Sequence, residues 1–161
     1  MGWALDRAGN LLLSDTLDNL VRVVAARTGM FYGQPMTAGD IYTIAGGGSG
    51  APHLGDGGPA TSATLAFPDG LTVDAAGNPV IADFADARVR VVAARTGTFY
   101  GQPMKADDIY TVAGTGTPGF AGDGHAATRA ELDEPAGAGL DRAGNLLVAD
   151  VGDGRVREIS R

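Results

Sequence analysis

The feature that most constrains this sequence is an internal repeat of about 68 residues. The block VRVVAARTGMFYGQPMTAGDIYTIAG (residues 21–46) returns as VRVVAARTGTFYGQPMKADDIYTVAG (residues 89–114), and only four positions differ. The shorter block LDRAGN at residues 5–10 returns as VDAAGN at residues 73–78 and again as LDRAGN at residues 140–145. A repeat of this length is one structural unit that buries its core against its neighbours. The chain is therefore predicted to stack two full units and a partial third.

Each full unit contains four short apolar runs of the kind that form β-strands. In the second unit these runs are residues 70–74, 78–83, 88–94 and 109–113. Most are rich in β-branched residues, and the DxAGN segment between the first two runs supplies Gly and Asn where a tight hairpin needs positive φ. The predicted units cover about residues 1–46, 69–114 and 136–161, and the third unit has only the first three runs.

Some runs are apolar on successive residues, as in Leu11–Leu13 and Val80–Ala82. Such strands are covered on both faces of their sheet. In a row of four-stranded antiparallel sheets, or blades, each sheet is covered by its two neighbours, which is the arrangement of a β-propeller. We therefore predict an all-β propeller segment over residues 1–161, with two full four-stranded blades and a three-stranded third. A β-sandwich is the alternative, and near identity of the units makes it less favourable.

The stretches PDGLTVDAAGNPVIADFADARVR (residues 68–90) and PAGAGLDRAGNLLVADVGDGRVR (residues 135–157) resemble NHL repeats. The first unit departs from that pattern at Trp3 and at Leu20, where the pattern has arginine. The resemblance implies a propeller, usually of six blades, whose relatives mostly bind partners or serve as scaffolds. Fold likeness alone says little about a substrate.

The net charge of −7 limits the partners of this chain. An acidic protein repels phosphates and anionic lipid headgroups, so we expect no nucleic acid and no membrane as a partner. The chain has no cysteine, which excludes disulfides and thiolate chemistry. It also shows no signal-peptide pattern and no apolar run of about 20 residues, and the compartment stays open.

Glycines at 114–119 match GxGxxG after a predicted strand. A dinucleotide site needs those glycines to open a helix in a βαβ unit, and the sequence offers no such helix. We therefore interpret them as loop glycines and expect no nucleotide cofactor. The two histidines, His53 and His125, are not at equivalent repeat positions, and no catalytic residue is predicted.

Five aspartates are the candidate ligand-binding residues. They are Asp15, Asp56, Asp83, Asp123 and Asp150. Three of them end the second strand of a unit, and two lie in GDG loops at the same predicted rim near the propeller axis. Carboxylates gathered there could hold a hard cation such as calcium. The alternative is that each carboxylate caps its turn or pairs with a nearby arginine such as Arg88 or Arg155.

The connection between the third and fourth strands is longer than a hairpin needs and carries FYGQPM in both full units. We predict an extended outer hairpin there. Its apolar residues either pack across neighbouring blades or form an exposed interaction patch. The residues concerned are Phe31, Tyr32, Pro35 and Met36, with their copies Phe99, Tyr100, Pro103 and Met104.

These features favour a non-enzymatic binding or scaffold module that takes a protein or small-molecule ligand. A metal-assisted hydrolase or lyase, as in propeller lactonases and lyases, is the alternative, and a cut-out or designed propeller fragment is a third. Three blades cannot close a ring, and apolar residues such as Leu11, Leu13, Val148 and Val156 are predicted on the end faces. Burying those faces would be favourable. We therefore expect two chains to form a homodimeric ring of six blades.

Overall fold

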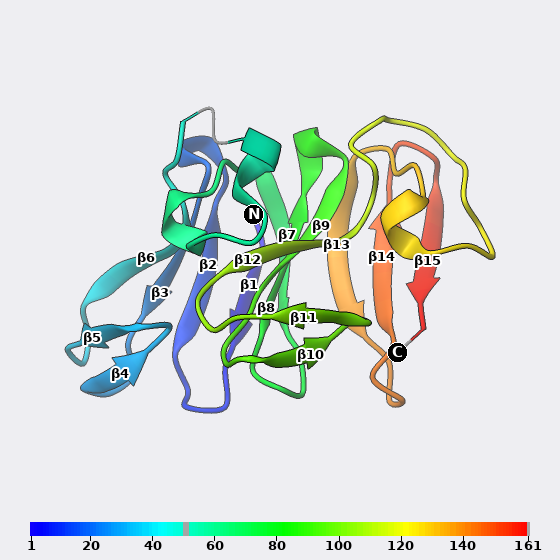
Figure 1. The fold of residues 1–161 in the computed structure, drawn as a ribbon. Coiled ribbons are helices and arrows are strands. Elements are labelled where there is room, and N and C mark those ends of the chain that lie inside the picture. The colour runs from blue at the N-terminus through cyan, green and yellow to red at the C-terminus, as the bar shows by residue number, and fades with distance from the viewer. Residues whose placement is uncertain (50–51, 161) are drawn as a thin grey trace.

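The computed structural model describes residues 1–49 and 52–160, with backbone only at 52 and 53. Its described residues form five antiparallel sheets, of which the three larger ones are blades placed side by side (Figure 1). Blade 1 consists of β1 (Trp3–Leu5), β2 (Leu11–Asp15), β3 (Leu20–Val24) and β6 (Ile41–Gly46). Blade 2 consists of β7 (Pro68–Val73), β8 (Pro79–Asp83), β9 (Arg88–Val92) and β12 (Ile109–Ala113). Blade 3 consists of β13 (Pro135–Leu140), β14 (Leu146–Asp150) and β15 (Arg155–Ile159). The predicted fold class, with two four-stranded blades and one of three strands, is confirmed.

The helices of the described residues are all short 3-10 turns. They are η1 (Thr16–Asp18), η2 (Pro52–Gly55), η3 (Ala60–Ser62), η4 (Phe84–Asp86) and η5 (Ala127–Arg129). In this part of the chain the GxGxxG stretch runs into a loop and opens no α-helix. None of these helices has the length and apolar character needed to cross a membrane.

The hairpin between the first two strands of each blade is held by its aspartate. The carboxylate of Asp6 accepts hydrogen bonds from the backbone N–H groups of Ala8 and Asn10 and from the side-chain amide of Asn10. Asp74 and Asp141 make the same bonds in blades 2 and 3. The DxAGN segment therefore builds its turn from local contacts, as its sequence predicts.

Glycine on the inner strands lets neighbouring blades approach closely. A Cβ atom on Gly70 would lie 2.6 Å from the carbonyl oxygen of Ala136, and one on Gly2 would lie 2.4 Å from that of Asp69. Real Cβ atoms do not come so near to backbone atoms, so only glycine fits where strand β7 passes its two neighbours.

Two apolar clusters join the three blades. The first lies between blades 1 and 2 and includes Leu12, Val21, Val23, Ile81, Val92 and Ile109. The second lies between blades 2 and 3 and includes Val80, Val89, Val91, Val112, Leu146 and Val148. Each blade thus offers one face to the blade before it and the other to the blade after it, which explains strands that are apolar on successive residues.

Val148 belongs to the second cluster, so its predicted place on an exposed end face is wrong. The register pairs Val148 with Ala138, which also packs against that cluster, and puts Ala149 opposite Val156. Side chains alternate between the two faces of a strand, so Val156 lies on the other face, where it is exposed.

The predicted outer hairpins are present as β4 (Gly29–Phe31) with β5 (Gln34–Met36), and β10 (Gly97–Phe99) with β11 (Gln102–Met104). Phe31, Tyr32 and Met36 pack in the cluster that blades 1 and 2 share. The hydroxyl of Tyr32 donates a hydrogen bond to Asp6, 3.0 Å away, and burial raises the pKa of Tyr32 well above its usual value. These residues therefore pack across the blades, while Met30 is exposed.

Candidate functional site

Arg90, on β9, binds two of the predicted site residues in one buried cluster. Its guanidinium donates to Asp83 at 3.3 Å and to Asp56 at 2.6 Å. It also donates to the carbonyl oxygens of Leu54 and Thr64, in the loop that enters blade 2. The side chains of Arg90 and Asp83 are fully buried. We call this arrangement of one arginine, two aspartates and a loop the arginine clasp.

Blade 3 has the same clasp around Arg157. Its guanidinium donates to Asp150 at 3.2 Å and forms an ion pair with Asp123 at 2.6 Å. The carbonyl oxygens of Ala121 and Glu131 accept its remaining hydrogen bonds. The loop positions correspond to those of the first clasp, so the repeat preserves the whole network.

Blade 1 has only half of this arrangement. Arg22 donates to Asp15 at 3.1 Å, and both side chains are partly exposed. Among the described residues Arg22 donates no hydrogen bond to a loop carbonyl oxygen. Its Nε atom, like that of Arg90, is buried without a hydrogen-bond partner. A shallow hollow of about 440 Å³ borders Asp15 and is lined by Leu17, Phe67 and Phe84.

The second-strand aspartates also close the turn before the inner strand of their own blade. Asp83 accepts a hydrogen bond from the backbone N–H of Ala66, and Asp150 accepts one from Asp133. Burial raises the pKa of Asp83 to about 7, although the N–H of Ala66 and the charge of Arg90 both act to lower it. Each clasp thus ties the second strand, the third strand and the entering loop together.

The structure therefore brings four of the five predicted aspartates together in two pairs, each around one arginine, and leaves Asp15 alone with Arg22. The arginines named from the sequence, Arg88 and Arg155, are not the partners. Arg88 lies directly opposite Asp83 in the strand register, but it donates instead to carbonyl oxygens of Asp86 and Thr115. Arg90, two residues further along β9, points to the same side of the sheet as Arg88 and reaches the carboxylate of Asp83 diagonally.

The clasp arginines are the residues that sequence reasoning missed. Arg22, Arg90 and Arg157 each follow the second-strand aspartate by seven residues, a spacing that recurs in all three units. That spacing is a usable signal, because a hairpin with a short turn places such residues diagonally across from each other on the same side of the sheet. Among the described residues no three histidine or acidic side chains form a group that could hold a metal ion.

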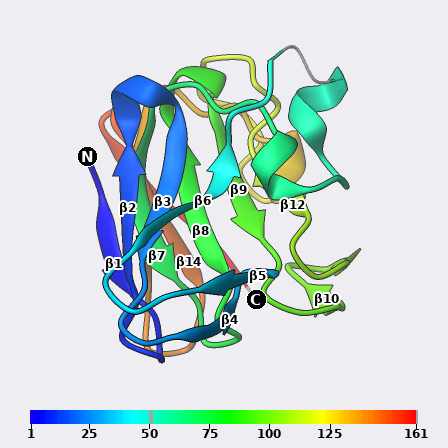
Figure 2. The same ribbon diagram turned by 90° about the vertical axis from the view of Figure 1, so that its left-hand side faces the viewer.

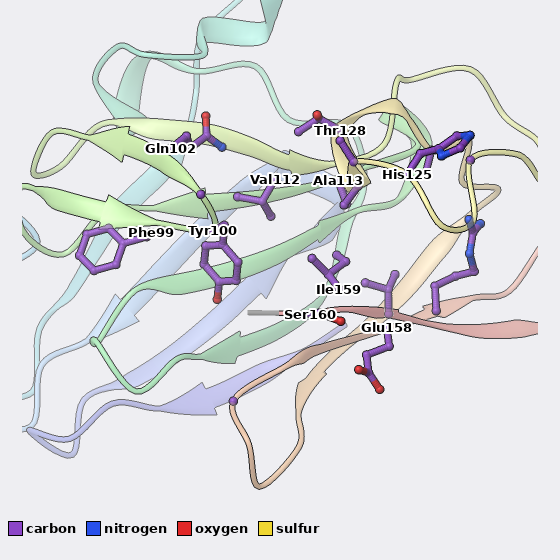
Figure 3. A pocket seen from close by; sticks show the side chains of 18 of the residues that line it. Phe99, Tyr100, Gln102, Val112, Ala113, His125, Thr128, Glu158, Ile159 and Ser160 are labelled. Atoms are coloured by element: carbon purple, nitrogen blue, oxygen red, sulfur yellow. The ribbon is translucent and has the colours of Figure 1, made fainter.

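A hollow of about 950 Å³ lies between the outer parts of blades 2 and 3 (Figure 3). Phe99 and Tyr100 of the second outer hairpin form one side, and Ile159 of β15 forms another. His125 and Thr128 come from the loop that enters blade 3. The side chain of His53, the other histidine, is outside the described part of the chain. We call this hollow the blade 3 groove.

The face of blade 1 that points away from blade 2 is turned toward the viewer in Figure 2. It carries exposed apolar side chains. Trp3 is 66% exposed, Leu5 is 59% exposed and Ile41 is 47% exposed. The strand register places Trp3 beside Leu13, and Leu5 beside Leu11, so one side of the sheet forms a continuous apolar surface. We call it the blade 1 end face.

No protein-family model matches this sequence, and no curated protein is significantly similar to it in sequence. Among solved structures, a protein of unknown function from Bacteroides thetaiotaomicron VPI-5482 matches 93% of this chain with a TM-score of 0.66 and 21% identity. An auxiliary nutrient binding protein from Bacteroides ovatus ATCC 8483 matches 98% of it with a TM-score of 0.64 and 16% identity.

These matches cover 32% and 36% of the two Bacteroides proteins, so the chain spans about a third of their length. At such low identity the likeness concerns the fold alone. Together with the strand order of its three sheets, it identifies the architecture of this chain as that of a β-propeller.

Proposed function

We propose that this chain is an NHL-type propeller segment that acts as a non-enzymatic binding or scaffold module, and that two copies close a six-bladed ring. The observation that carries the proposal is the blade 1 end face. Its residues occupy the repeat positions that blade 2 uses to pack against blade 1. A surface built like an interface is expected to be covered by another blade.

The correspondence follows from the spacing of 68 residues. Trp3, Leu5, Leu13, Val24 and Ile41 correspond in turn to Leu71, Val73, Ile81, Val92 and Ile109. All five of the blade 2 residues belong to the cluster between blades 1 and 2 or pack against it, and Ile109 is fully buried. Leaving the equivalent residues of blade 1 in water costs about 25 cal/mol for each Å² of apolar surface.

The opposite end of the segment, on blade 3, matches this face less well. Leu147 and Val156 stand at the positions of the buried residues Val80 and Val89. Glu158, however, replaces the buried Val91, and it accepts a hydrogen bond from Asn145. A carboxylate brought into an interface without a cation loses its hydration, so this residue should weaken closure of the ring.

The arginine clasps favour a scaffold over a catalyst. Asp83 and Asp150, which would have to serve a metal-assisted hydrolase or lyase, are buried against Arg90 and Arg157. Their oxygen atoms hold the entering loops of blades 2 and 3 in place. These ion pairs leave the aspartates poorly suited to bind a metal ion. They also fix the blades to one another's loops, which makes the ring a rigid support for a bound partner.

Light scattering over a range of concentrations tests the proposal. We expect a particle of twice 16.2 kDa that dissociates on dilution. Trp3→Ser should weaken the dimer, whereas Met30→Ser should not, because Met30 is equally exposed at 67% but lies on the outer hairpin. Glu158→Val should strengthen it. A monomer at all concentrations, or equal effects of the two serine variants, would show that the end faces do not form the ring.

A further inference from the structure

The outer edge of β15 is unpaired within the described residues. In the other blades the third strand has a neighbour on each side, because β3 pairs with β2 and β6, and β9 pairs with β8 and β12. In blade 3, β15 pairs with β14 alone. An unpaired strand edge exposes backbone N–H and C=O groups that can bind another extended chain.

In blade 2 the fourth strand is held on its other side as well, by the loop that enters the blade. The backbone N–H of Gly57 donates to the carbonyl oxygen of Ile109 at 2.8 Å, and the N–H of Ile109 donates to that of Gly58 at 3.0 Å. The N–H of Ala60 donates to the carbonyl oxygen of Asp107 at 2.9 Å. The start of β12 is therefore fixed between β9 and this loop.

The loop that enters blade 3 repeats this geometry and offers the same groups. Gly124, His125 and Ala127 correspond to the three loop residues that bind the start of β12 in blade 2. The N–H groups of Gly124 and Ala127 and the carbonyl oxygen of His125 have no hydrogen-bond partner among the described residues. The edge of β15 and residues 124–127 thus form the two sides of one slot.

The blade 3 groove is where an apolar side chain of a fourth strand would lie. In the first interface Ile109 is fully buried in the cluster against which Phe31 and Tyr32 pack. The equivalent aromatic residues at the second interface, Phe99 and Tyr100, line the groove together with Ile159 (Figure 3). A branched aliphatic side chain at the position equivalent to Ile109 would fill this space.

We propose that this slot binds an extended polypeptide segment that has the outer-strand sequence of the repeat, Ile-Tyr-Thr-Val-Ala. The two copies of this strand within the chain, β6 and β12, show how it pairs with the third strand of a blade. By analogy with β12 on β9, the isoleucine lies opposite Ile159, the tyrosine opposite Glu158 and the threonine opposite Arg157. Backbone hydrogen bonds to both sides of the slot give affinity, and the groove selects the isoleucine.

The test uses a labelled synthetic peptide with the sequence of residues 105–114, KADDIYTVAG, titrated with the full chain and followed by fluorescence anisotropy. We expect saturable binding of one peptide per chain. A peptide with aspartate in place of its isoleucine should bind about tenfold more weakly or worse, because the groove would bury an unpaired charge. A scrambled peptide of the same composition should not bind.

Two proline variants of the loop provide a matched pair. Ala127→Pro removes one N–H of the slot at the first position of η5, where proline is tolerated. It should weaken peptide binding by about three- to tenfold, the effect of one hydrogen bond. Ala126→Pro keeps the slot N–H groups and places proline where the first loop already has Pro59. This variant should bind like the original chain.

The proposal is overturned if the peptide does not bind, if the scrambled peptide binds equally well, or if both proline variants behave alike. It is also overturned if added peptide lowers the mass seen by light scattering. The peptide would then displace a second copy of the chain, and the slot would be part of the dimer interface. Trp3 lies on blade 1, at the other end of the segment from the slot, so Trp3→Ser should leave peptide affinity unchanged. The two proposals can thus fail separately.

Discussion

Replacing Arg90 by methionine removes the centre of the first arginine clasp while keeping a long apolar side chain. The guanidinium binds Asp83, Asp56 and two loop carbonyl oxygens, and its side chain is fully buried. Without it, the carboxylate of Asp83 stays buried and, among the described residues, keeps only the backbone N–H of Ala66 as a hydrogen-bond donor. The matched control is Arg22→Met, at the equivalent position of blade 1.

The two substitutions should differ several-fold in their cost. Removing one member of a buried ion pair costs about 3–5 kcal/mol, because the other charge is left uncompensated. Arg22 has one carboxylate partner, Asp15, and both are about a third exposed, so its loss should cost about 0–1 kcal/mol. A domain of this size has about 5–15 kcal/mol of stability in total, so Arg90→Met should still fold while showing a large change.

Urea denaturation between pH 5 and pH 8 measures these differences. The pKa of Asp83 is raised by burial to about 7, and loss of Arg90 removes an interaction that lowers it. The folded variant then keeps a proton on Asp83 at pH values where the unfolded chain, with an aspartate pKa of about 3.9, has lost it. Its free energy of unfolding should therefore fall as the pH rises through this window, and the penalty should be smallest at pH 5.

A second substitution checks the cause. In the Arg90→Met background, Asp83→Asn removes the uncompensated charge and should recover part of the lost stability at pH 8 but little at pH 5. The reasoning is refuted if Arg90→Met costs no more than Arg22→Met, or if its cost is independent of pH.

Three further predictions rest on the repeat and its internal controls. Gly70→Ala should destabilise the chain by about 1–3 kcal/mol, because its Cβ would strike the backbone of blade 3, whereas Gly139→Ala meets nothing within 4 Å and should be neutral in thermal unfolding. At protein concentrations where light scattering shows a single chain, Ile109→Ala should cost about 2–5 kcal/mol in urea denaturation and Ile41→Ala far less, since only Ile109 is buried within the chain; equal costs would contradict this account of the first interface. Calcium at millimolar concentration should not raise the melting temperature, because the aspartates are ion-paired, and a rise that Asp83→Asn abolishes would restore the cation site.

Much of the fold could be predicted from the sequence because its signals are local. The DxAGN hairpins are closed by bonds that span no more than four residues, as between Asp6 and Asn10. Strand order within a blade follows from consecutive hairpins. The outer hairpins are indicated in the sequence by a connection too long for a tight turn. Their residues Phe31 and Tyr32 pack between blades, which was one of the two predictions; the other was an exposed patch.

The candidate site was predicted only in part. The five aspartates were predicted as ligand-binding residues, and pairing with a nearby arginine was the alternative. The contacts with Arg22, Arg90 and Arg157 correspond to that alternative. The seven-residue spacing pairs the second-strand aspartate with an arginine in every blade, even in blade 1, where Arg22 has no loop partner. The path of the entering loop decides only the second half of the clasp, in which Leu54, Asp56 and Thr64 accept hydrogen bonds from Arg90.

The sequence by itself determined the repeat, the strands and the hairpins, because alternation, glycine and asparagine act over a few residues. Tertiary structure alone decided which face of each strand is covered. Val148 and Val156 look alike in the sequence, yet one is fully buried and the other is 72% exposed. The physical reason is that burial depends on which blade lies beside a strand, and that neighbour comes from a unit about 68 residues away.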